Sequence, residues 1–324
     1  MAKVLVVGGA GYIGSHTVKH FLQNGYECVV VDNLVCGHKE AVLDPAEFEL
    51  ADLMDKESLQ RVFAKHKFDA VVHFAAYSLV GESVENPQKY YHNNVIGTLN
   101  LLDVMIKNKV NKIVFSSTCA TYGNPQYVPL DEKHNQNPIN PYGQTKLVIE
   151  KIFEDYAKAY GLKYIALRYF NAAGASPEGE IGESHNPESH LIPLVLKAIK
   201  GERENIKIFG NDYDTPDGTC LRDYIHVDDL ALAHRLAVEK SDEYSGFINL
   251  GTGIPTSVLE IIKAAENVSG KSCPMIYEAR RAGDPDVLYA DNKKAKEILG
   301  WEPHYTSIEE IIKTAWNWET NRRF

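Results

Sequence analysis

Two residues spaced four apart could act together on a proton. Tyr142 and Lys146 form a Tyr-x-x-x-Lys pair, and on a helix this spacing places both side chains on one face. A free phenol has a pKa of about 10, which is too high for a base at neutral pH. A nearby ammonium favours the phenolate, so we expect Lys146 to lower that pKa. Such a pair suits proton removal from an alcohol while a hydride leaves the same carbon.

Two neighbouring features support this interpretation. Thr118 follows the apolar run Lys112–Phe115, which predicts a strand, and its hydroxyl could hydrogen-bond the same substrate oxygen. Pro141 directly precedes Tyr142 and is typical of the first turn of a helix. Tyrosine and lysine four apart are also common on surface helices, so the pair gains weight only beside a cofactor site in the same chain.

The N-terminus has the pattern of a dinucleotide site. The apolar run Val4–Val7 predicts a buried parallel strand, and an amphipathic helix is predicted over Tyr12–Asn24. Between them, Gly9-Ala-Gly-Tyr-Ile-Gly14 satisfies Gly-x-Gly-x-x-Gly, with Gly8 in front. Such glycines allow a sharp turn, close approach of backbone N–H groups to a pyrophosphate, and packing of the helix on the sheet. The N-terminus of the helix then faces the anion.

A second strand, Glu27–Val31, ends in Asp32, eighteen residues after Gly14. At that position a carboxylate can accept both ribose hydroxyls of NAD. No lysine or arginine follows before Lys39, so a 2′-phosphate lacks a partner. The pattern therefore indicates NAD rather than NADP.

Composition excludes several classes of protein. The 324 residues carry 34 basic and 44 acidic side chains, a net charge of −10, which argues against nucleic acid as a partner. No apolar run is long enough for a membrane span, and the N-terminus lacks the layout of a signal peptide. The cysteines (28, 36, 119, 220 and 273) are odd in number and form no Cys-x-x-Cys pair, so we expect free thiols and a cytoplasmic location. No metal-site motif is found.

Strands and helices alternate through the first half of the chain. Further strands are predicted at Phe48–Leu50, Ala70–Phe74, Lys112–Phe115 and Tyr164–Arg168, and helices at Ser58–His66, Tyr90–Lys107 and Tyr142–Tyr160. This order predicts an α/β protein with a doubly wound parallel sheet of the Rossmann type, whose ligands bind at the carboxyl ends of the strands.

The pattern changes after Asn171, and a smaller α/β domain is predicted. Helices are expected at Ile192–Lys200 and Val227–Glu239, and a strand at Phe247–Leu250. We place that last helix and strand on the first sheet. Residues 1–172 with about 222–253 then form the NAD-binding domain, and residues 173–221 and 254–324 the substrate domain.

Several motifs resemble those of the extended short-chain dehydrogenase/reductase family. They are Gly8–Gly14, Phe115–Gly123, Asn140–Lys146 and Arg168–Gly174. Three further stretches look like the UDP-glucose 4-epimerases within that family, and the likeness runs from end to end: His190–Pro193, Thr215–Val227 and Arg280–Asp284.

The resemblance implies an enzyme that binds NAD and a UDP-sugar. Tyr142 would take the proton of the sugar 4-hydroxyl, assisted by Thr118 and Lys146, while the C4 hydride passes to NAD. The 4-keto sugar would rotate and be reduced on its other face. The residues implied for NAD are Gly8, Gly11, Tyr12, Ile13, Gly14, Asp32, Asn33, Asp52, Leu53, Phe74, Ala75, Asn93, Lys146 and Phe170. Those implied for the substrate are Thr118, Tyr142, Asn171, His190, Arg222, Arg281 and Asp284.

The family also implies a homodimer, formed by helices at about Tyr91–Lys107 and Gln144–Tyr160. This sequence departs from the family pattern at three positions. His92 precedes Asn93 where an acid is usual, Ser78 stands where some relatives have lysine, and His190 stands where asparagine is common.

Other functions remain open at this point. A 4,6-dehydratase would carry an Asp-Glu pair after Thr118, where this chain has Cys119-Ala120. A 4-epimerase for UDP-xylose and UDP-arabinose, for UDP-glucuronate, or for N-acetylated sugars is a closer rival. Leu288 is smaller than the tyrosine that excludes the acetyl group in some relatives, so we expect some turnover of UDP-N-acetylgalactosamine. A non-catalytic NAD sensor is the alternative from another class, and such proteins often lack Tyr142 or Lys146.

Overall fold

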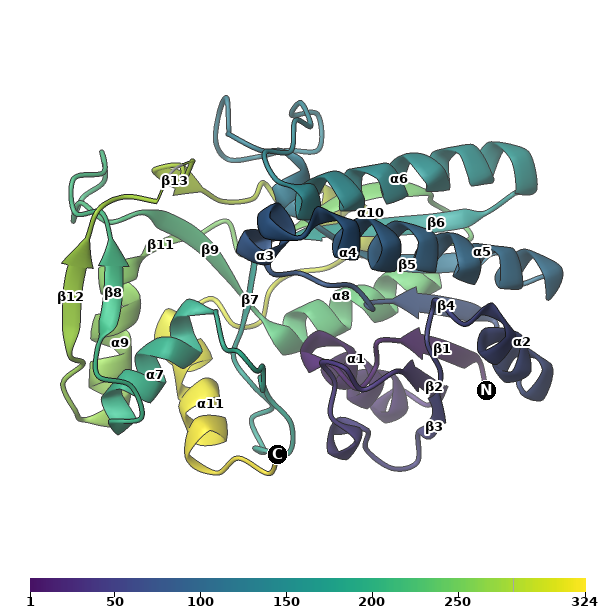
Figure 1. Ribbon diagram of the computed structural model, residues 1–324, viewed down its shortest axis with the longest axis horizontal. Coiled ribbons are helices and arrows are strands. Elements are labelled where there is room, and N and C mark those ends of the chain that lie inside the picture. Colours follow the sequence, from purple (N-terminus) through teal and green to yellow (C-terminus); the bar gives the residue numbers. More distant parts are fainter. Residues whose placement is uncertain (282) are drawn as a thin grey trace.

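A parallel sheet of seven strands organises one side of the molecule (Figure 1). The computed structural model describes residues 1–281 and 283–324. The strand order is β10-β6-β5-β4-β1-β2-β3, and each neighbouring pair is parallel. The strands are β1 (Lys3–Val7), β2 (Glu27–Asp32), β3 (Glu47–Leu50), β4 (Ala70–His73), β5 (Lys112–Thr118), β6 (Lys163–Tyr169) and β10 (Gly246–Leu250). The predicted doubly wound sheet is confirmed.

Helices cover both faces of this sheet, which is why its strands are apolar without interruption. Leu5 and Val7 belong to one core cluster, whereas Val4 and Val6 belong to the other. Helices α2 (Lys56–Lys65), α5 (Gly97–Lys107) and α6 (Pro141–Tyr160) pack on the first face, and α1 (Tyr12–Gln23), α8 (Val227–Lys240) and α10 (Lys293–Leu299) on the second.

The helix predicted over Tyr90–Lys107 is wrong in detail. The chain forms α3 (Val80–Glu85) and α4 (Pro87–Tyr90), then one stretch of π-helix, η2 (Tyr91–Ile96), before α5 begins. Within η2, Asn94 is buried and its side chain hydrogen-bonds both the N–H and the carbonyl of Tyr77, at 2.9 and 3.0 Å. The π-helix thus turns a polar side chain inward, where it fixes the segment after β4.

A second, smaller group of elements lies beside the first sheet (Figure 1). A four-stranded sheet contains β7 (Asn171–Ala173), β9 (Leu221–His226), β11 (Pro255–Ser257) and β13 (Val287–Leu288), and β8 (Ile206–Phe209) pairs with β12 (Met275–Glu278). Helices α7 (Leu191–Lys200), α9 (Val258–Ser269) and α11 (Ile308–Thr320) share one apolar core there. Two short 3-10 helices, η1 (Lys39–Ala41) and η3 (Cys119–Thr121), complete the chain.

The chain returns to the first sheet after β9. Strand β10 pairs with β6, which confirms the predicted placement of this strand and of the helix before it. The exact limits of the two predicted domains stay a prediction, and β9 itself belongs to the second sheet. Ala282, inside the Arg280–Asp284 motif, lies outside the described residues.

Two further sequence predictions concern the whole chain. The five cysteines are all free thiols, as their odd number predicts. Across residues 1–281 and 283–324, none of the helices combines the length and apolar character needed to cross a membrane.

A buried ion pair joins α6 to β6. The Arg168 guanidinium donates to both oxygens of Glu150, at 2.9 Å from Nε and 2.6 Å from Nη2, and both side chains are almost completely shielded from water. Ser117 and Gln136 donate to the same carboxylate at 2.6 and 2.8 Å. Every charge is therefore matched by hydrogen bonds, the condition under which a buried pair is tolerated.

We expect Glu150→Gln to destabilise the protein by roughly 3–5 kcal/mol, because it leaves the Arg168 charge buried without its partner. Urea unfolding followed by circular dichroism measures this loss. Glu154→Gln on the same helix is the matched control. Glu154 pairs with Lys151 at 3.1 Å with both side chains partly exposed, so about 0–1 kcal/mol is expected. Equal losses for the two variants would contradict the role given to the buried pair.

Candidate active site

The start of α6 carries the Tyr-x-x-x-Lys pair. Asn140 caps the helix by accepting a hydrogen bond from the Gly143 N–H at 2.8 Å, and Pro141 occupies the first turn as predicted. A Cβ on Gly143 would lie 2.5 Å from the carbonyl oxygen of Ala120. Glycine is therefore required for α6 to begin directly against η3, the turn that follows Thr118.

Tyr142, Lys146 and Thr118 come together at the carboxyl end of β5. The Lys146 Nζ donates to the Ser116 carbonyl at 2.7 Å and lies 5.9 Å from the centroid of the Tyr142 ring. Thr118 is the last residue of β5 and is buried. The structure thus assembles the three residues expected to act on an alcohol proton.

The pKa of Tyr142 differs from the sequence expectation. Burial raises it to about 12, and the contact with Thr118 opposes this rise without overcoming it. Burial also lowers the pKa of Lys146 to about 7, against the attraction of the Glu150 carboxylate. Desolvation therefore favours the uncharged form of both groups.

The glycine loop between β1 and α1 is built for close backbone contacts. Gly8 has φ +81°, and a Cβ there would lie 2.6 Å from the Ala75 nitrogen. A Cβ on Gly14 would collide with the carbonyl oxygen of Gly8. Gly11 differs, since its nearest protein atom would be 3.4 Å away. Gly11 is also the N-cap of α1 and makes no side-chain cap, so the N–H groups of Tyr12 and Ile13 in the first turn stay available to an anion.

Asp32 closes the other side of this loop. Its carboxylate accepts from the Ala10 N–H at 3.0 Å and the Leu34 N–H at 2.9 Å, which leaves two lone-pair sites. Burial raises the Asp32 pKa, and these backbone donors oppose that rise. Asn33 donates to Asp52 at 2.8 Å, and both residues line a hollow of about 290 Å³ beside the ends of β2 and β3. The site therefore has the anion cradle, the ribose acceptor and the recess that a dinucleotide needs.

The other residues expected at NAD lie around the same strand ends. The N–H groups of Phe74 and Ala75 both donate to the Val7 carbonyl, at 2.8 and 3.1 Å. Leu53 is buried and packs under α5, and Phe170 is buried between β6 and β7. Asn93 donates to Asn94 at 3.0 Å.

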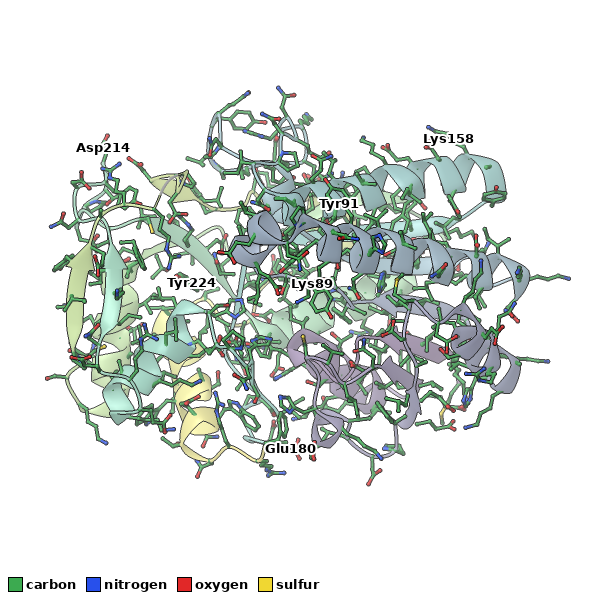
Figure 2. All side chains as sticks on the ribbon, viewed as in Figure 1. Lys89, Tyr91, Lys158, Glu180, Asp214 and Tyr224 are labelled. Carbon is green, nitrogen blue, oxygen red and sulfur yellow. The ribbon has the colours of Figure 1, made fainter. Side chains whose placement is uncertain are left out.

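Two residues near this site were missed by sequence reasoning. Asn94, next to the predicted Asn93, also donates to Thr145 on α6 at 3.2 Å, so it ties the Tyr77 segment to the catalytic helix. Lys89 lies on α4 (Figure 2), with its Nζ 4.0 Å from the ring centroid of Tyr77. Lys89 thus lies over the ring of the residue that precedes Ser78, and it also pairs with Glu82 at 2.6 Å. Neither residue could be picked out without the π-helix and α4, which the periodicity did not reveal.

The residues expected at the uridine diphosphate gather around β9. Arg222 forms an ion pair with Asp284 at 3.3 Å, and Asn171 of β7 donates to the Asp223 carbonyl at 3.0 Å. Leu288 of β13 is in register with Arg222. Arg281 lies over the Phe209 ring at 4.0 Å. A hollow of about 600 Å³, lined by Asn124–Val128, Asp214 and Gly283–Val287, lies alongside.

His190, the last residue expected at the substrate, has other neighbours. It is the N-cap of α7, and its Nδ1 lies 2.5 Å from Glu183 and 3.4 Å from Glu188. Burial opposes a charge on His190, but the two carboxylates prevail and raise its pKa to about 10. No contact joins it to the Arg222 group among the described residues.

Comparison with known proteins adds to this geometry. The model of the NAD dependent epimerase/dehydratase family matches residues 4–251. A UDP-glucose 4-epimerase of Halalkalibacterium halodurans is 54% identical over 317 residues, covering 97% of this chain and 95% of that protein.

Solved structures of similar proteins cover the whole chain. A UDP-glucose 4-epimerase of Bifidobacterium longum in complex with NAD⁺ and UDP is 40% identical, with a TM-score of 0.94 and 99% of each chain covered. A UDP-Glc/GlcNAc 4-epimerase of Campylobacter jejuni is 43% identical, with a TM-score of 0.88, and covers 99% of this chain and 100% of that one.

Two glycines of the loop should respond differently to substitution by alanine. Gly11→Ala meets no close protein atom and has an ordinary φ of −82°, so it should fold normally. Its methyl group would occupy the space where a pyrophosphate approaches, and we expect NAD to bind at least about tenfold more weakly. Gly14→Ala should instead lower the unfolding midpoint, because its methyl group collides with backbone. Calorimetric titration with NAD and thermal unfolding measure the two effects. Full NAD affinity in Gly11→Ala would contradict this assignment.

Proposed function

Because the chain belongs to the NAD dependent epimerase/dehydratase family, we propose that it interconverts UDP-galactose and UDP-glucose by oxidising and re-reducing C4 of the sugar. The observation that carries the proposal is the meeting of Tyr142, Lys146 and Thr118 beside a glycine loop fit for NAD. A chain that only sensed NAD would have no need of a buried phenol and amine at that point.

The proton of the 4-hydroxyl is handled by the chain itself. Tyr142 accepts it as the C4–H bond breaks, and Thr118 holds the sugar oxygen by a hydrogen bond. NAD, when bound, accepts the hydride from C4 and later returns it. After the 4-keto sugar has rotated to present its other face, Tyr142 returns the proton to the same oxygen. Proton and hydride are both restored, so the reaction consumes no cofactor.

A phenol with a pKa of about 12 needs help to act at neutral pH. Lys146 is well placed to give it, because its Nζ has no carboxylate within hydrogen-bonding distance and donates only to the Ser116 carbonyl at 2.7 Å. Any further positive charge near the phenol would favour the phenolate. We infer that a bound ligand carrying positive charge helps the phenol to act as the base.

The sugar must rotate while its nucleotide stays fixed, so the diphosphate needs a firm hold. Arg222 and Arg281 supply planar guanidinium groups that suit phosphate oxygens, and Asp284 and Asn171 supply ribose and amide contacts. The ion pair between Arg222 and Asp284 at 3.3 Å supports this assignment, because it brings the two side chains together.

The direct test uses purified protein and UDP-galactose with no added NAD, followed by a coupled dehydrogenase specific for UDP-glucose. We expect product, because the cofactor is regenerated in each cycle and retained. Tyr142→Phe is the control, and we expect it to lose about 10²–10⁴ in kcat while keeping its NAD, since only the proton acceptor is removed. A wild type that holds NAD yet converts no UDP-galactose would contradict the proposal and favour a sensor or another sugar.

The same assay extends to N-acetylated sugars. Leu288 is half-buried beside Phe170 and in register with Arg222, so it borders both the expected cofactor and diphosphate contacts. With UDP-N-acetylgalactosamine we expect measurable turnover in the wild type and loss of it in Leu288→Tyr, with UDP-galactose turnover retained. No turnover at saturating concentration would contradict this part of the proposal.

We further infer that the chain forms a homodimer through η2, α5 and α6. Apolar side chains on η2 and α5 are left partly exposed, among them Tyr91, Ile96 and Ile106, each 38% exposed. Figure 2 labels Tyr91 between α6 and the α4–α5 helices. A second copy would cover these side chains and shield them from water.

Light scattering after size-exclusion chromatography tests the dimer. We expect twice the chain mass for the wild type and the mass of one chain for Ile96→Glu, because a charge would be buried without a partner. Ile254→Glu is the matched control, since Ile254 is 47% exposed and lies after β10, away from these helices. A monomeric wild type would overturn the inference.

A further inference from the structure

Four possible metal ligands meet in the segment between β7 and α7. They are Glu183, His185, Glu188 and His190, and one donor atom of each lies within 4.8 Å of all the others. Within residues 1–281 and 283–324, this is the only such group of three or more histidine, cysteine or acidic side chains. The spacing Glu-x-His-x-x-Glu-x-His fits no familiar helical motif, which explains why the sequence predicted no metal site.

The two carboxylates are unusually buried for a loop. The side chains of Glu183 and Glu188 are 6% and 3% exposed. Glu188 Oε1 accepts from the Ser189 and His190 N–H groups at 2.7 and 2.9 Å, which fixes the orientation of the carboxylate. Its Oε2 is buried and has no hydrogen-bond partner. A buried carboxylate oxygen without a partner is costly, and a bound cation would remove that cost.

The distances between donor atoms fit a small tetrahedral ion. Zinc is bound by histidine nitrogen at about 2.0–2.1 Å and by carboxylate oxygen at about 2.0–2.2 Å, so its donors lie about 3.3 Å apart. His185 Nδ1 lies 3.1 Å from Glu183 and 3.9 Å from Glu188. His190 Nδ1 lies 2.5 and 3.4 Å from the same two residues. All four distances are measured to the Oε1 atoms of the two glutamates, and they bracket the tetrahedral value. The shortest would have to widen and the longest to narrow around an ion.

We propose that Glu183, His185, Glu188 and His190 bind one Zn²⁺ ion. Two imidazoles and two carboxylates make a complete set of four ligands, as in structural zinc sites, with no open position for a substrate. The competing state is a protonated His190 held between the two carboxylates. A divalent ion would instead neutralise both carboxylates and leave both imidazoles uncharged.

The position of the site indicates what the ion does. The segment is attached to the NAD-binding side of the molecule at three places. Tyr12 donates to the Gly174 carbonyl at 2.6 Å, Lys19 pairs with Glu178 at 2.7 Å, and the His38 ring contacts the Ser184 carbonyl at 2.9 Å. The Tyr12 ring also lies edge-on to His185, with centroids 6.2 Å apart.

The segment thus links α1, which faces the cofactor, to α7 of the second domain. Lys19 also pairs with Glu180, labelled in Figure 2, from the same segment. Zinc would fix the end of the segment nearest α7, where its four ligands lie. Tyr12, which contacts both Gly174 and His185, would then be held in place at the start of α1, next to the glycine loop. The ion therefore has a structural role, separate from the chemistry at Tyr142.

The experiment uses protein without an affinity tag, stripped with a chelator and then dialysed against zinc. Elemental analysis should find one zinc per chain. Replacement by Co²⁺ should produce the visible absorption bands of a tetrahedral ion with nitrogen and oxygen ligands, without the charge-transfer band of a thiolate. The midpoint of thermal unfolding should rise when zinc is added.

His185→Gln and Glu188→Gln should each weaken zinc binding by at least about 100-fold, since each removes a direct ligand, and loss of an outer partner alone costs about 10–100-fold. His66→Gln is the matched control, because His66 pairs with Glu49 at 2.9 Å outside this cluster. Far-UV circular dichroism and retained NAD show that each variant is folded.

Two results would overturn the proposal. One is a wild type that takes up no zinc and shows no cobalt bands, which would favour the protonated His190. The other is unchanged zinc content in both cluster variants, which would place the ion elsewhere. Neither readout depends on epimerase activity, so failure here is distinguishable from failure of the proposed function.

Discussion

The catalytic helix depends on one buried ion pair. Glu150 lies one turn beyond Lys146 on α6, and Arg168 lies on β6. Arg168 also donates to the Tyr122 hydroxyl at 3.0 Å, which in turn donates to Asn249 of β10 at 2.6 Å. Helix α6 is therefore fixed through Glu150 to β6 by Arg168 and to β5 by Ser117, and the network continues through Tyr122 to β10. The bonds that involve a charge are strengthened by the low dielectric around them. Without that pair, the polar contacts described above that would still fix Tyr142 and Lys146 are those at the start of α6, from Asn94 to Thr145 and from Lys146 to the Ser116 carbonyl.

The same low dielectric explains the state of the catalytic pair. It strengthens the Glu150–Arg168 attraction, yet it disfavours a charge on Tyr142 and on Lys146, whose pKa values move in opposite directions to about 12 and about 7. Both shifts favour neutral groups. The surroundings thus keep the Tyr142 phenol protonated at neutral pH and let Lys146 gain or lose its proton there, and any positive charge near the phenol favours the phenolate. The burial that strengthens the Glu150–Arg168 pair is therefore also the cause of the shifted pKa values of Tyr142 and Lys146.

Sequence alone predicted most of the first sheet and its site, because these rest on strong local signals. The apolar run Val4–Val7 predicts a buried strand, and the glycines of Gly8–Gly14 predict a tight turn into a helix. The pairing of Tyr142 with Lys146 follows from helical spacing alone. The rest depends on contacts distant in sequence. Strand β12 is exposed along its length and pairs with β8 almost seventy residues earlier, so neither hydrophobic alternation nor burial marks it. The π-helix η2 interrupts a pattern that reads as one helix, and the inward turn of Asn94 has no signal in residue type. The raised pKa of Tyr142 likewise reflects burial, which spacing cannot reveal.

The two halves of the site are joined through Asp223, a buried residue between Arg222 and Tyr224 on β9. Its carboxylate accepts from Thr252 and Gly253 N–H groups at 2.8 and 3.0 Å, and from Ala290 at 3.1 Å. A Cβ on Gly251 would collide with the Asp223 carboxylate, so the first residue after β10 must be glycine for the backbone to come this close. The Asp223 carboxylate on β9 therefore binds the backbone just after β10 and that of Ala290, two residues after β13. Leu288 and Arg222 are held in register by this arrangement, so the proposed diphosphate contact and the proposed border of the sugar pocket depend on the same backbone contacts. A change that widens the pocket at Leu288 leaves that framework untouched, whereas a change at Asp223 would disturb the cofactor and substrate sides together.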